Sequence, residues 1–164
     1  MEPGTRIGRR YEIVSVGGRS WLGQRYRARD LEVDIAVALL AVDSDLLPDG
    51  DVKRALPHFL RCKSLQNPQL VRMYDAFVDA GTSKLYVVEP WLEAVELRKY
   101  LAGMHKRREL LQPEELVDFV LQLVNGLDYA HRSGLLVPEL SSETVFVDGS
   151  GLRIAGIGYA QAVG

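Results

Sequence analysis

The chain has 164 residues, of which 47% are hydrophobic, and a formal net charge of -2 at pH 7. This length and hydrophobic content suit one hydrophobic core or two small lobes and argue against intrinsic disorder. A nearly neutral chain has no global attraction for nucleic acid or anionic lipid, so we expect neither as a partner. The longest apolar run, Ile35 to Val42, is too short to cross a bilayer, and we expect no direct membrane insertion.

The single cysteine, Cys62, cannot form an internal disulfide. The N-terminus lacks the charged-then-apolar pattern of a signal peptide, so we expect a cytoplasmic location. The three histidines, His58, His105 and His131, show no metal-ligand spacing with one another or with Cys62. The sequence therefore predicts no metal site.

Charge is unevenly distributed near the N-terminus, where a basic stretch precedes an acidic one. We expect two solvated faces that partly neutralise each other. The basic residues are Arg6, Arg9, Arg10, Arg19, Arg25, Arg27 and Arg29, and the acidic ones are Asp43, Asp45, Asp49 and Asp51.

The first ninety residues favour strands. Tyr11 to Val16 alternates apolar and polar residues, Gly17-Gly18 interrupts the pattern, and Gln24 to Arg29 is expected to pair with it in a hairpin. Ile35 to Val42 has no polar residue, which predicts a central strand covered on both faces. Two further strands are expected at Leu70 to Val78 and Lys84 to Glu89, for five in total.

One helix is expected among these strands, from Asp51 to Leu65. Pro57 lies in its middle, where a proline removes a backbone donor and clashes with the preceding turn. We therefore expect a broken or late-starting helix with Pro57 near its first turn.

Helices dominate after Leu97. We expect a short helix from Leu97 to Met104, followed by a solvated basic loop from His105 to Arg108. A long helix is expected between Pro113, a favoured first helical residue, and Gly134, a favoured stop. A final hairpin is expected from Thr144 to Val147 and Leu152 to Ala155.

Five short strings occur in the same order as these elements. They are Arg10-Tyr11-Glu12-Ile13-Val14, Tyr26-Arg27-Ala28-Arg29-Asp30, Asn67-Pro68-Gln69-Leu70-Val71, Leu85-Tyr86-Val87-Val88 and Leu127-Asp128-Tyr129-Ala130-His131-Arg132-Ser133-Gly134-Leu135. Together they resemble the eukaryotic-like (bacterial-type) Ser/Thr protein kinase family, cut short after the Asp-Phe-Gly position. The resemblance implies an α+β, protein-kinase-like fold. Residues 1–92 would form a five-stranded antiparallel N-lobe with one helix and the hinge, and residues 93–164 a partial helical C-lobe.

The resemblance also locates the nucleotide-binding positions of the family. Its glycine-rich loop corresponds to Gly18-Arg19-Ser20-Trp21-Leu22-Gly23, in which Ser20 replaces the middle glycine and Trp21 sits at the tip. Trp21 is expected either to plug the nucleotide cleft or to anchor a partner. Leu40 stands where the family has its phosphate-pairing lysine, and His58 where it has the glutamate that orients that lysine. Glu89 stands where an apolar gatekeeper is usual.

The catalytic positions differ in the same way. The catalytic loop corresponds to Val137-Pro138-Glu139-Leu140-Ser141, with Thr144 at the asparagine position. Gly156-Ile157-Gly158 corresponds to Asp-Phe-Gly and offers Mg²⁺ no carboxylate. Only Glu139 retains an acid, and a solvated or capping role is favoured for it.

The differences predict a catalytically inactive pseudokinase, without a cofactor, that acts as a scaffold or regulator. The enzyme alternative is an atypical kinase or nucleotide-binding switch that uses Glu139 with other phosphate contacts. A further alternative is an unrelated α+β adaptor whose strings match by chance.

The long helix carries more apolar surface than one packed face requires. One stripe contains Leu116, Phe119, Val120, Leu123, Leu127 and Ala130, and a second contains Val117, Leu121 and Val124. We expect this surface, centred on Leu116, Phe119, Val120, Leu123, Val124 and Leu127, to be covered by a partner protein, a second copy or a C-terminal remainder of a longer chain.

Overall fold

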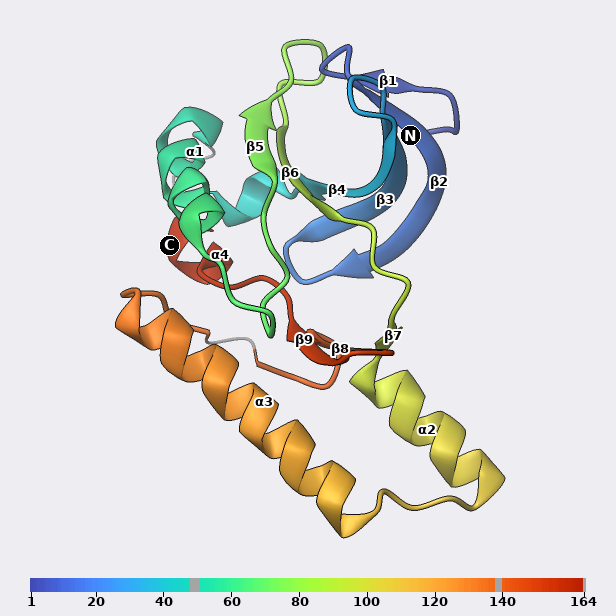
Figure 1. The fold of residues 1–164 in the computed structure, drawn as a ribbon. Coiled ribbons are helices and arrows are strands. Elements are labelled where there is room, and N and C mark those ends of the chain that lie inside the picture. Colours follow the sequence, from blue (N-terminus) through green and yellow to red (C-terminus); the bar gives the residue numbers. More distant parts are fainter. Residues whose placement is uncertain (48–50, 138–139, 164) are drawn as a thin grey trace. The chain divides into compact units, whose positions relative to one another are not determined.

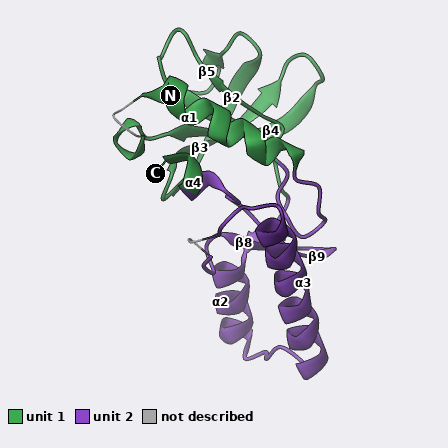
Figure 2. Ribbon diagram, turned by 90° about the vertical axis from the view of Figure 1, so that its left-hand side faces the viewer, with its two compact units in different colours: residues 1–64, 73–92, 161–164 green, residues 65–72, 93–160 purple. Residues whose placement is uncertain are grey.

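The computed structural model describes residues 1–47, 51–137 and 140–163 (Figure 1). They form two compact units (Figure 2). The first contains the described residues up to Ser64, then Met73–Leu92 and the C-terminal residues from Gln161, and the second contains Leu65–Arg72 and Glu93–Ala160. No helix within the described ranges is long and apolar enough to span a membrane.

The first unit is built on one antiparallel sheet with the strand order β1-β2-β3-β4-β6-β5. The five predicted strands are all present, and the two-residue β1 is added at one edge. The strands are β1 (Arg6–Ile7), β2 (Tyr11–Ser20), β3 (Gly23–Asp30), β4 (Ile35–Val42), β5 (Asp75–Val78) and β6 (Leu85–Pro90).

The central strand β4 is buried on both faces from Val37 to Val42, as its apolar sequence predicts. On one face, Val37, Leu39 and Ala41 join the main hydrophobic core. Tyr86 of β6 also belongs to this core, and its ring stacks on Phe77 of β5 with the centroids 5.6 Å apart. The remaining core residues are Ile7, Tyr11, Ile13, Tyr26, Ala28 and Val88.

The prediction that Gly17-Gly18 interrupts the first long strand was wrong. Strand β2 continues to Ser20, and the hairpin turns at Trp21-Leu22. The pairing of β2 with β3 shifts register twice, between Ile13 and Ser15 and between Val16 and Arg19. Such bulges absorb extra residues and bend the strand, so the glycines remain within it.

Helix α1 (Val52–Arg61) also differs from the prediction, because it begins before Pro57 and contains it. The Asp51 side chain accepts hydrogen bonds from the backbone N–H groups of Lys53 and Arg54, which caps the helix. Pro57 removes the donor that would bond to the Lys53 carbonyl. Both residues are exposed, so water can satisfy that carbonyl. Two 3₁₀ turns, Ser44–Leu46 and Cys62–Ser64, complete the first unit.

The predicted strand at Leu70 to Val78 is shorter than expected, because β5 begins only at Asp75. Leu70 instead forms an isolated parallel bridge with Ile154 of the second unit's sheet. The Val71 N–H donates to the Ile154 carbonyl at 2.8 Å, and the Ile154 N–H donates to the Gln69 carbonyl at 2.7 Å. These bonds tie residues 65–72 to the second unit.

The second unit contains a three-stranded sheet in the order β7-β8-β9 and two longer helices. The prediction of a basic loop from His105 to Arg108 was wrong, because α2 continues to Arg107. The helix is capped by Arg108, whose backbone is in the left-handed conformation. Basic side chains favour the last turn of a helix, where they face its negative dipole end. The elements are β7 (Val95–Glu96), α2 (Leu97–Arg107), α3 (Pro113–Arg132), β8 (Val145–Asp148) and β9 (Gly151–Ile154). The last helix, α4 (Tyr159–Val163), begins in the second unit and ends in the first.

Helix α3 confirms the prediction from its end signals. Pro113 occupies the first turn with Glu114 and Glu115, and Gly134 follows Ser133 with φ of 74°. Gly126, in its middle, allows close packing: a Cβ there would lie 3.1 Å from Gln69 Cβ and 3.1 Å from Ile154 Cδ1.

Several arginines of the basic N-terminal stretch form ion pairs within the first unit. Arg6, Arg19 and Arg29 are largely exposed, as a solvated face requires, whereas Arg25 is mostly buried. The pairs are Arg6 with Glu12, Arg10 with Asp30 and Glu32, Arg19 with Asp43, Arg25 with Glu89, and Arg29 with Asp34. Of the predicted acidic stretch, Asp49 lies outside the described residues.

The Arg10–Asp30 pair joins the start of β2 to the end of β3. The guanidinium donates to both carboxylate oxygens at 2.7 to 3.0 Å, and Asp30 is buried. The hydrogen bond from Arg10 holds the pKa of Asp30 below its usual value, against the opposing effect of burial. Charged hydrogen bonds with little exposure contribute more to stability than exposed pairs do.

We predict that Asp30→Asn lowers the free energy of unfolding by about 2 kcal/mol at pH 7, because the charged hydrogen bonds to Arg10 are lost. Because the folded-state pKa is depressed, this contribution is complete above the unfolded pKa of about 3.9 and is lost as pH falls through the lower folded value. Urea unfolding of both proteins between pH 7 and pH 3 measures the difference.

The control is Asp34→Asn, which alters the exposed pair with Arg29 and should change stability by less than about 0.5 kcal/mol. Asparagine tolerates the left-handed backbone that Asp34 adopts, with φ of 57°. Equal effects of the two variants would contradict the prediction.

Candidate functional site

The glycine-rich stretch from Gly18 to Gly23 forms the tip of the β2–β3 hairpin. The Gln24 side chain donates to the carbonyls of Gly17 at 2.9 Å and Gly18 at 3.2 Å. Arg19 forms an ion pair with Asp43, just after β4. The hairpin tip is therefore held by side chains of the same unit.

Trp21 and Ser20 occupy the turn of this hairpin. Trp21 is half-buried, so its side chain is neither a fully buried plug nor a fully exposed anchor. The Ser20 hydroxyl donates to the Gly23 carbonyl at 3.3 Å and closes the turn.

Gly23 has a structural reason to be glycine. Its φ is +152°, and a Cβ built on it would lie 2.0 Å from the carbonyl oxygen of Ala41 on β4. No side chain fits at this distance. At Gly18, by contrast, a Cβ would meet nothing within 4 Å. The retained glycine thus serves the pairing of β3 with β4 without any need for a phosphate ligand.

We predict that Gly23→Ala destabilises the first unit by more than about 2 kcal/mol, because the methyl group collides with the β4 backbone. The matched variant Gly18→Ala should stay within about 0.5 kcal/mol of the parent. Thermal unfolding of both variants measures the difference, and a Gly23→Ala protein as stable as Gly18→Ala would refute the steric explanation.

Leu40 lies on the face of the sheet opposite the main core. Residues alternate along a strand, so Ala38 and Leu40 point away from the core that contains Leu39. Leu40 is paired with Arg25 on β3 and with Val87 on β6. We call this surface the Leu40 face; its members are Arg25, Arg27, Ala38, Leu40, Val87 and Glu89.

An ion pair crosses β4 on the Leu40 face. Arg25 Nη2 donates to Glu89 Oε2 at 3.1 Å, and the two side chains are 20% and 4% exposed. Glu89 therefore points into the interior of this face and not outward. Beside the pair, the Arg27 guanidinium lies over the Trp91 ring, 5.3 Å from its centroid.

The predicted position of the lysine-orienting glutamate, His58, lies on the exposed side of α1. Its carbonyl accepts a hydrogen bond from the Cys62 thiol at 3.8 Å. Burial raises the pKa of Cys62 to about 11, so this thiol is protonated at neutral pH. Nothing in this arrangement points to a reactive cysteine.

In the predicted catalytic loop, Glu139 lies outside the described residues. The adjoining Ser141 and Thr144 close a turn before β8. The Ser141 N–H donates to Thr144 Oγ1 at 2.9 Å, and the Thr144 N–H donates to the Ser141 carbonyl at 3.1 Å. Thr144 thus has a clear structural role at the start of the hairpin.

Gly156 follows β9 with φ of +75°, a conformation that glycine adopts readily. Its carbonyl accepts a hydrogen bond from the Tyr159 N–H at 3.2 Å at the start of α4. Among the residues that the structure describes, no three His, Cys, Asp or Glu side chains lie close enough to hold a metal ion.

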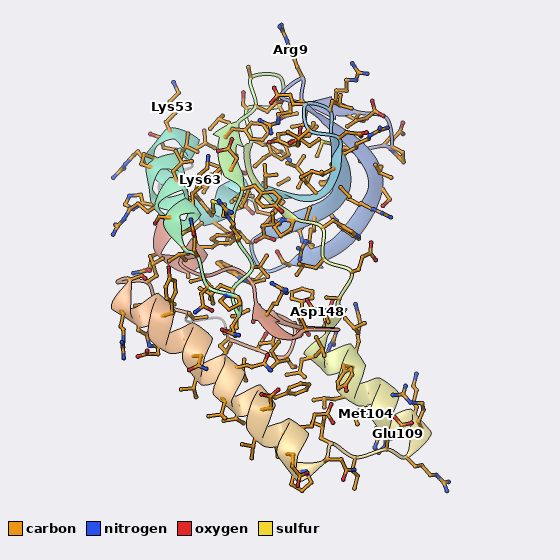
Figure 3. All side chains as sticks on the ribbon, viewed as in Figure 1. Arg9, Lys53, Lys63, Met104, Glu109 and Asp148 are labelled. Atoms are coloured by element: carbon orange, nitrogen blue, oxygen red, sulfur yellow. The ribbon has the colours of Figure 1, made fainter. Side chains whose placement is uncertain are left out.

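Asp148, a carboxylate of the second unit with a shifted pKa, lies in the β8–β9 hairpin (Figure 3). Burial alone would raise its pKa, but hydrogen bonds from Ser150 and Arg153 lower it to about 2. Arg153 Nε lies 2.6 Å from an Asp148 oxygen. The carboxylate therefore serves the hairpin turn and is an improbable proton acceptor at neutral pH.

Helix α3 divides the predicted partner-binding residues between two faces. Phe119 is buried against Val145 and Leu152 of the hairpin, and Leu123 is half-buried beside it. Leu127 is also half-buried. The exposed apolar residues are Leu116, Val117, Val120, Leu121 and Val124, each 49% to 57% exposed. We call these five the α3 surface.

The Arg25–Glu89 pair is a feature that sequence reasoning missed. Arg25 occurs two residues after Gly23, where the kinase glycine-rich motif G-x-G-x-x-G-x-V has valine. Glu89 stands at the predicted gatekeeper position. The sequence does show opposite charges at two positions that are usually apolar. That these two charges pair becomes clear only from the β3-β4-β6 register.

Comparison with known proteins gives a consistent result. The family model of protein tyrosine and serine/threonine kinases matches residues 19–163. The chain is 29% identical over 169 residues to the probable serine/threonine-protein kinase SCO3848 of Streptomyces coelicolor and 25% identical over 162 residues to the serine/threonine-protein kinase PrkC of Bacillus subtilis. The alignments cover 100% and 98% of this chain, but only 24% of each relative.

Solved structures show the same fold. The crystal structure of the Mycobacterium tuberculosis PknI kinase domain superposes with a TM-score of 0.81 at 19% identity. The match covers 97% of this chain and 62% of that domain. At this identity the likeness supports the fold alone.

Proposed function

The chain belongs to the protein tyrosine and serine/threonine kinase family, in its bacterial Ser/Thr branch, and we propose that it is a catalytically inactive member that works by binding another protein. The proposal rests mainly on the position and burial of Leu40. It occupies the predicted position of the phosphate-pairing lysine and lies within the sheet at 6% exposure. A buried isobutyl group cannot neutralise a phosphate.

The family implies Mg²⁺ and ATP as ligands, and the residues at the corresponding positions do not fit them. Gly156 has no side chain to coordinate the metal, and Thr144 bonds within its own turn. Ser20 likewise bonds within the hairpin tip. Phosphoryl transfer depends mainly on charges placed around phosphates and metal, and these positions supply none.

The curated relatives are named as kinases, and the chain spans only about a quarter of their length. The activity of a whole protein that contains this chain is therefore part of the proposal. The competing function is a nucleotide-binding switch that uses Glu139, and a nucleotide titration separates the two.

We predict that ATP raises the melting temperature of this chain by less than 1 °C, about the scatter of such a measurement, with or without Mg²⁺. A ligand that binds the native state at 100 times its Kd would stabilise it by about 2.7 kcal/mol, a shift of several degrees. An active kinase domain serves as the positive control. A large Mg²⁺-dependent shift would refute the proposed inactivity.

We further propose that the α3 surface binds the partner, whether another protein, a second copy or more of the same chain. Its five side chains lie on one side of the helix, away from the Phe119 stripe that contacts the hairpin. Each of the five is about half exposed, so this side of the helix keeps an accessible apolar surface. These side chains are already about half buried, so covering each one contributes roughly half of the 1.5 to 3 kcal/mol that burial of a fully exposed side chain gives, and several together can drive association.

The double variant Leu121→Gln/Val124→Gln tests this surface. Both residues are more than half exposed, so we expect unfolding to change by less than about 1 kcal/mol, while self-association or binding of a hydrophobic dye falls. Light scattering and dye fluorescence measure the two effects. A parent chain that is monomeric and binds no dye would contradict the role of this surface.

A buried variant provides the control for that experiment. Phe119→Ala should lower the free energy of unfolding by about 3 kcal/mol, because it opens a cavity against Val145 and Leu152. If the Gln variants destabilise the chain as much as Phe119→Ala does, the α3 surface is part of the core.

The proposal also assigns the chain to the cytoplasm, where a free cysteine such as Cys62 is usual.

A further inference from the structure

The Leu40 face carries a charged contact that the kinase resemblance does not account for. We propose that the Arg25–Glu89 ion pair is an internal substitute for the nucleotide base, covering the part of the sheet on which the family holds its nucleotide. This inference rests on the proposed function, since it explains how an inactive member keeps this face stable without a ligand.

The strand register places the pair directly over β4. Arg25 is paired with Leu40, and Glu89 is paired with Ala38, so the two charged side chains start from diagonal positions on either side of the strand. The 3.1 Å bond between them therefore passes across the strand between Ala38 and Leu40. A base that stacked on this strand would have to displace the bond.

Burial makes that displacement unfavourable. Glu89 is 4% exposed and Arg25 is 20% exposed, so both charges have given up most of their water. A buried charge that loses its partner bears the full cost of desolvation. Adenine is neutral and presents apolar faces, so it cannot replace either charge.

A second contact closes the neighbouring part of the same face. Arg27 is paired with Ala38 on the side opposite Glu89, and its guanidinium lies over the Trp91 ring. The aromatic ring that follows β6 is thereby engaged by a cation of the same lobe. Arg25 and Arg27 of β3 thus occupy space that would have to be open for a nucleotide to bind.

A double-mutant cycle tests the pair. Arg25→Val introduces the residue of the family motif, and Glu89→Met introduces an apolar side chain of similar size. We expect each single variant to lower the urea midpoint, because the remaining buried charge loses this bond. We expect the double variant to recover most of that loss. If Glu89→Met does not fold, Glu89→Gln replaces it, with a smaller loss expected.

The matched control is the cycle of Arg29→Val and Asp34→Asn, an ion pair that also begins on β3. Its side chains are 58% and 68% exposed, so we expect additive and small changes in midpoint. The structural part of the proposal would be overturned if the coupling between the two substitutions were equally large in both cycles. It would also be overturned if neither cycle showed any coupling.

The second readout is adenosine, which lacks phosphates and needs no metal. We expect adenosine to leave the melting temperature of the parent chain unchanged and to raise that of Arg25→Val/Glu89→Met. An equal shift in both proteins, or no shift in either, would show that the pair is not what excludes the base. Neither result bears on the missing phosphate and metal contacts, whereas a Mg²⁺-dependent shift of the parent with ATP would refute the proposed function itself.

Discussion

The first unit depends on β4, a strand without polar side chains that lies between β3 and β6 and is buried on both faces from Val37 onward. One face of this strand forms the core with Tyr26 and Tyr86. The other face has to be covered as well, because exposed leucine and valine would forfeit much of the stabilisation that the strand provides. In a catalytic kinase, a lysine and a nucleotide would share that face.

Here the covering groups come from the chain itself. Leu40 adds to the apolar surface, and Arg25 and Glu89 lie across it as a largely desolvated pair. The glycine-rich hairpin is also held by contacts within the unit, because Gln24 donates to the Gly17 and Gly18 carbonyls and Asp43 pairs with Arg19. These contacts support the proposal that the first unit keeps its fold without a bound nucleotide.

The second unit concentrates its apolar surface on α3. Phe119 and Gly126 fix the packed side of this helix, the first by filling the space beside the hairpin and the second by allowing close approach to Ile154. The opposite side retains an exposed apolar surface. The β8–β9 hairpin beside Phe119 is held by the contact between Asp148 and Arg153. The proposed working surface is therefore a helix side and not a cleft.

The sequence by itself determined five strands of the first unit, though not all of their ends, as well as the long helix and the family. The uninterrupted apolar run of β4 and the end signals Pro113 and Gly134 are local, so they could be read residue by residue. The tertiary structure decided what depends on contacts between distant residues. Gly17-Gly18 stays within β2 because bulges in its pairing with β3 absorb the extra residues. Arg25 and Glu89 are separated by 64 residues, and only the strand register brings their charges together.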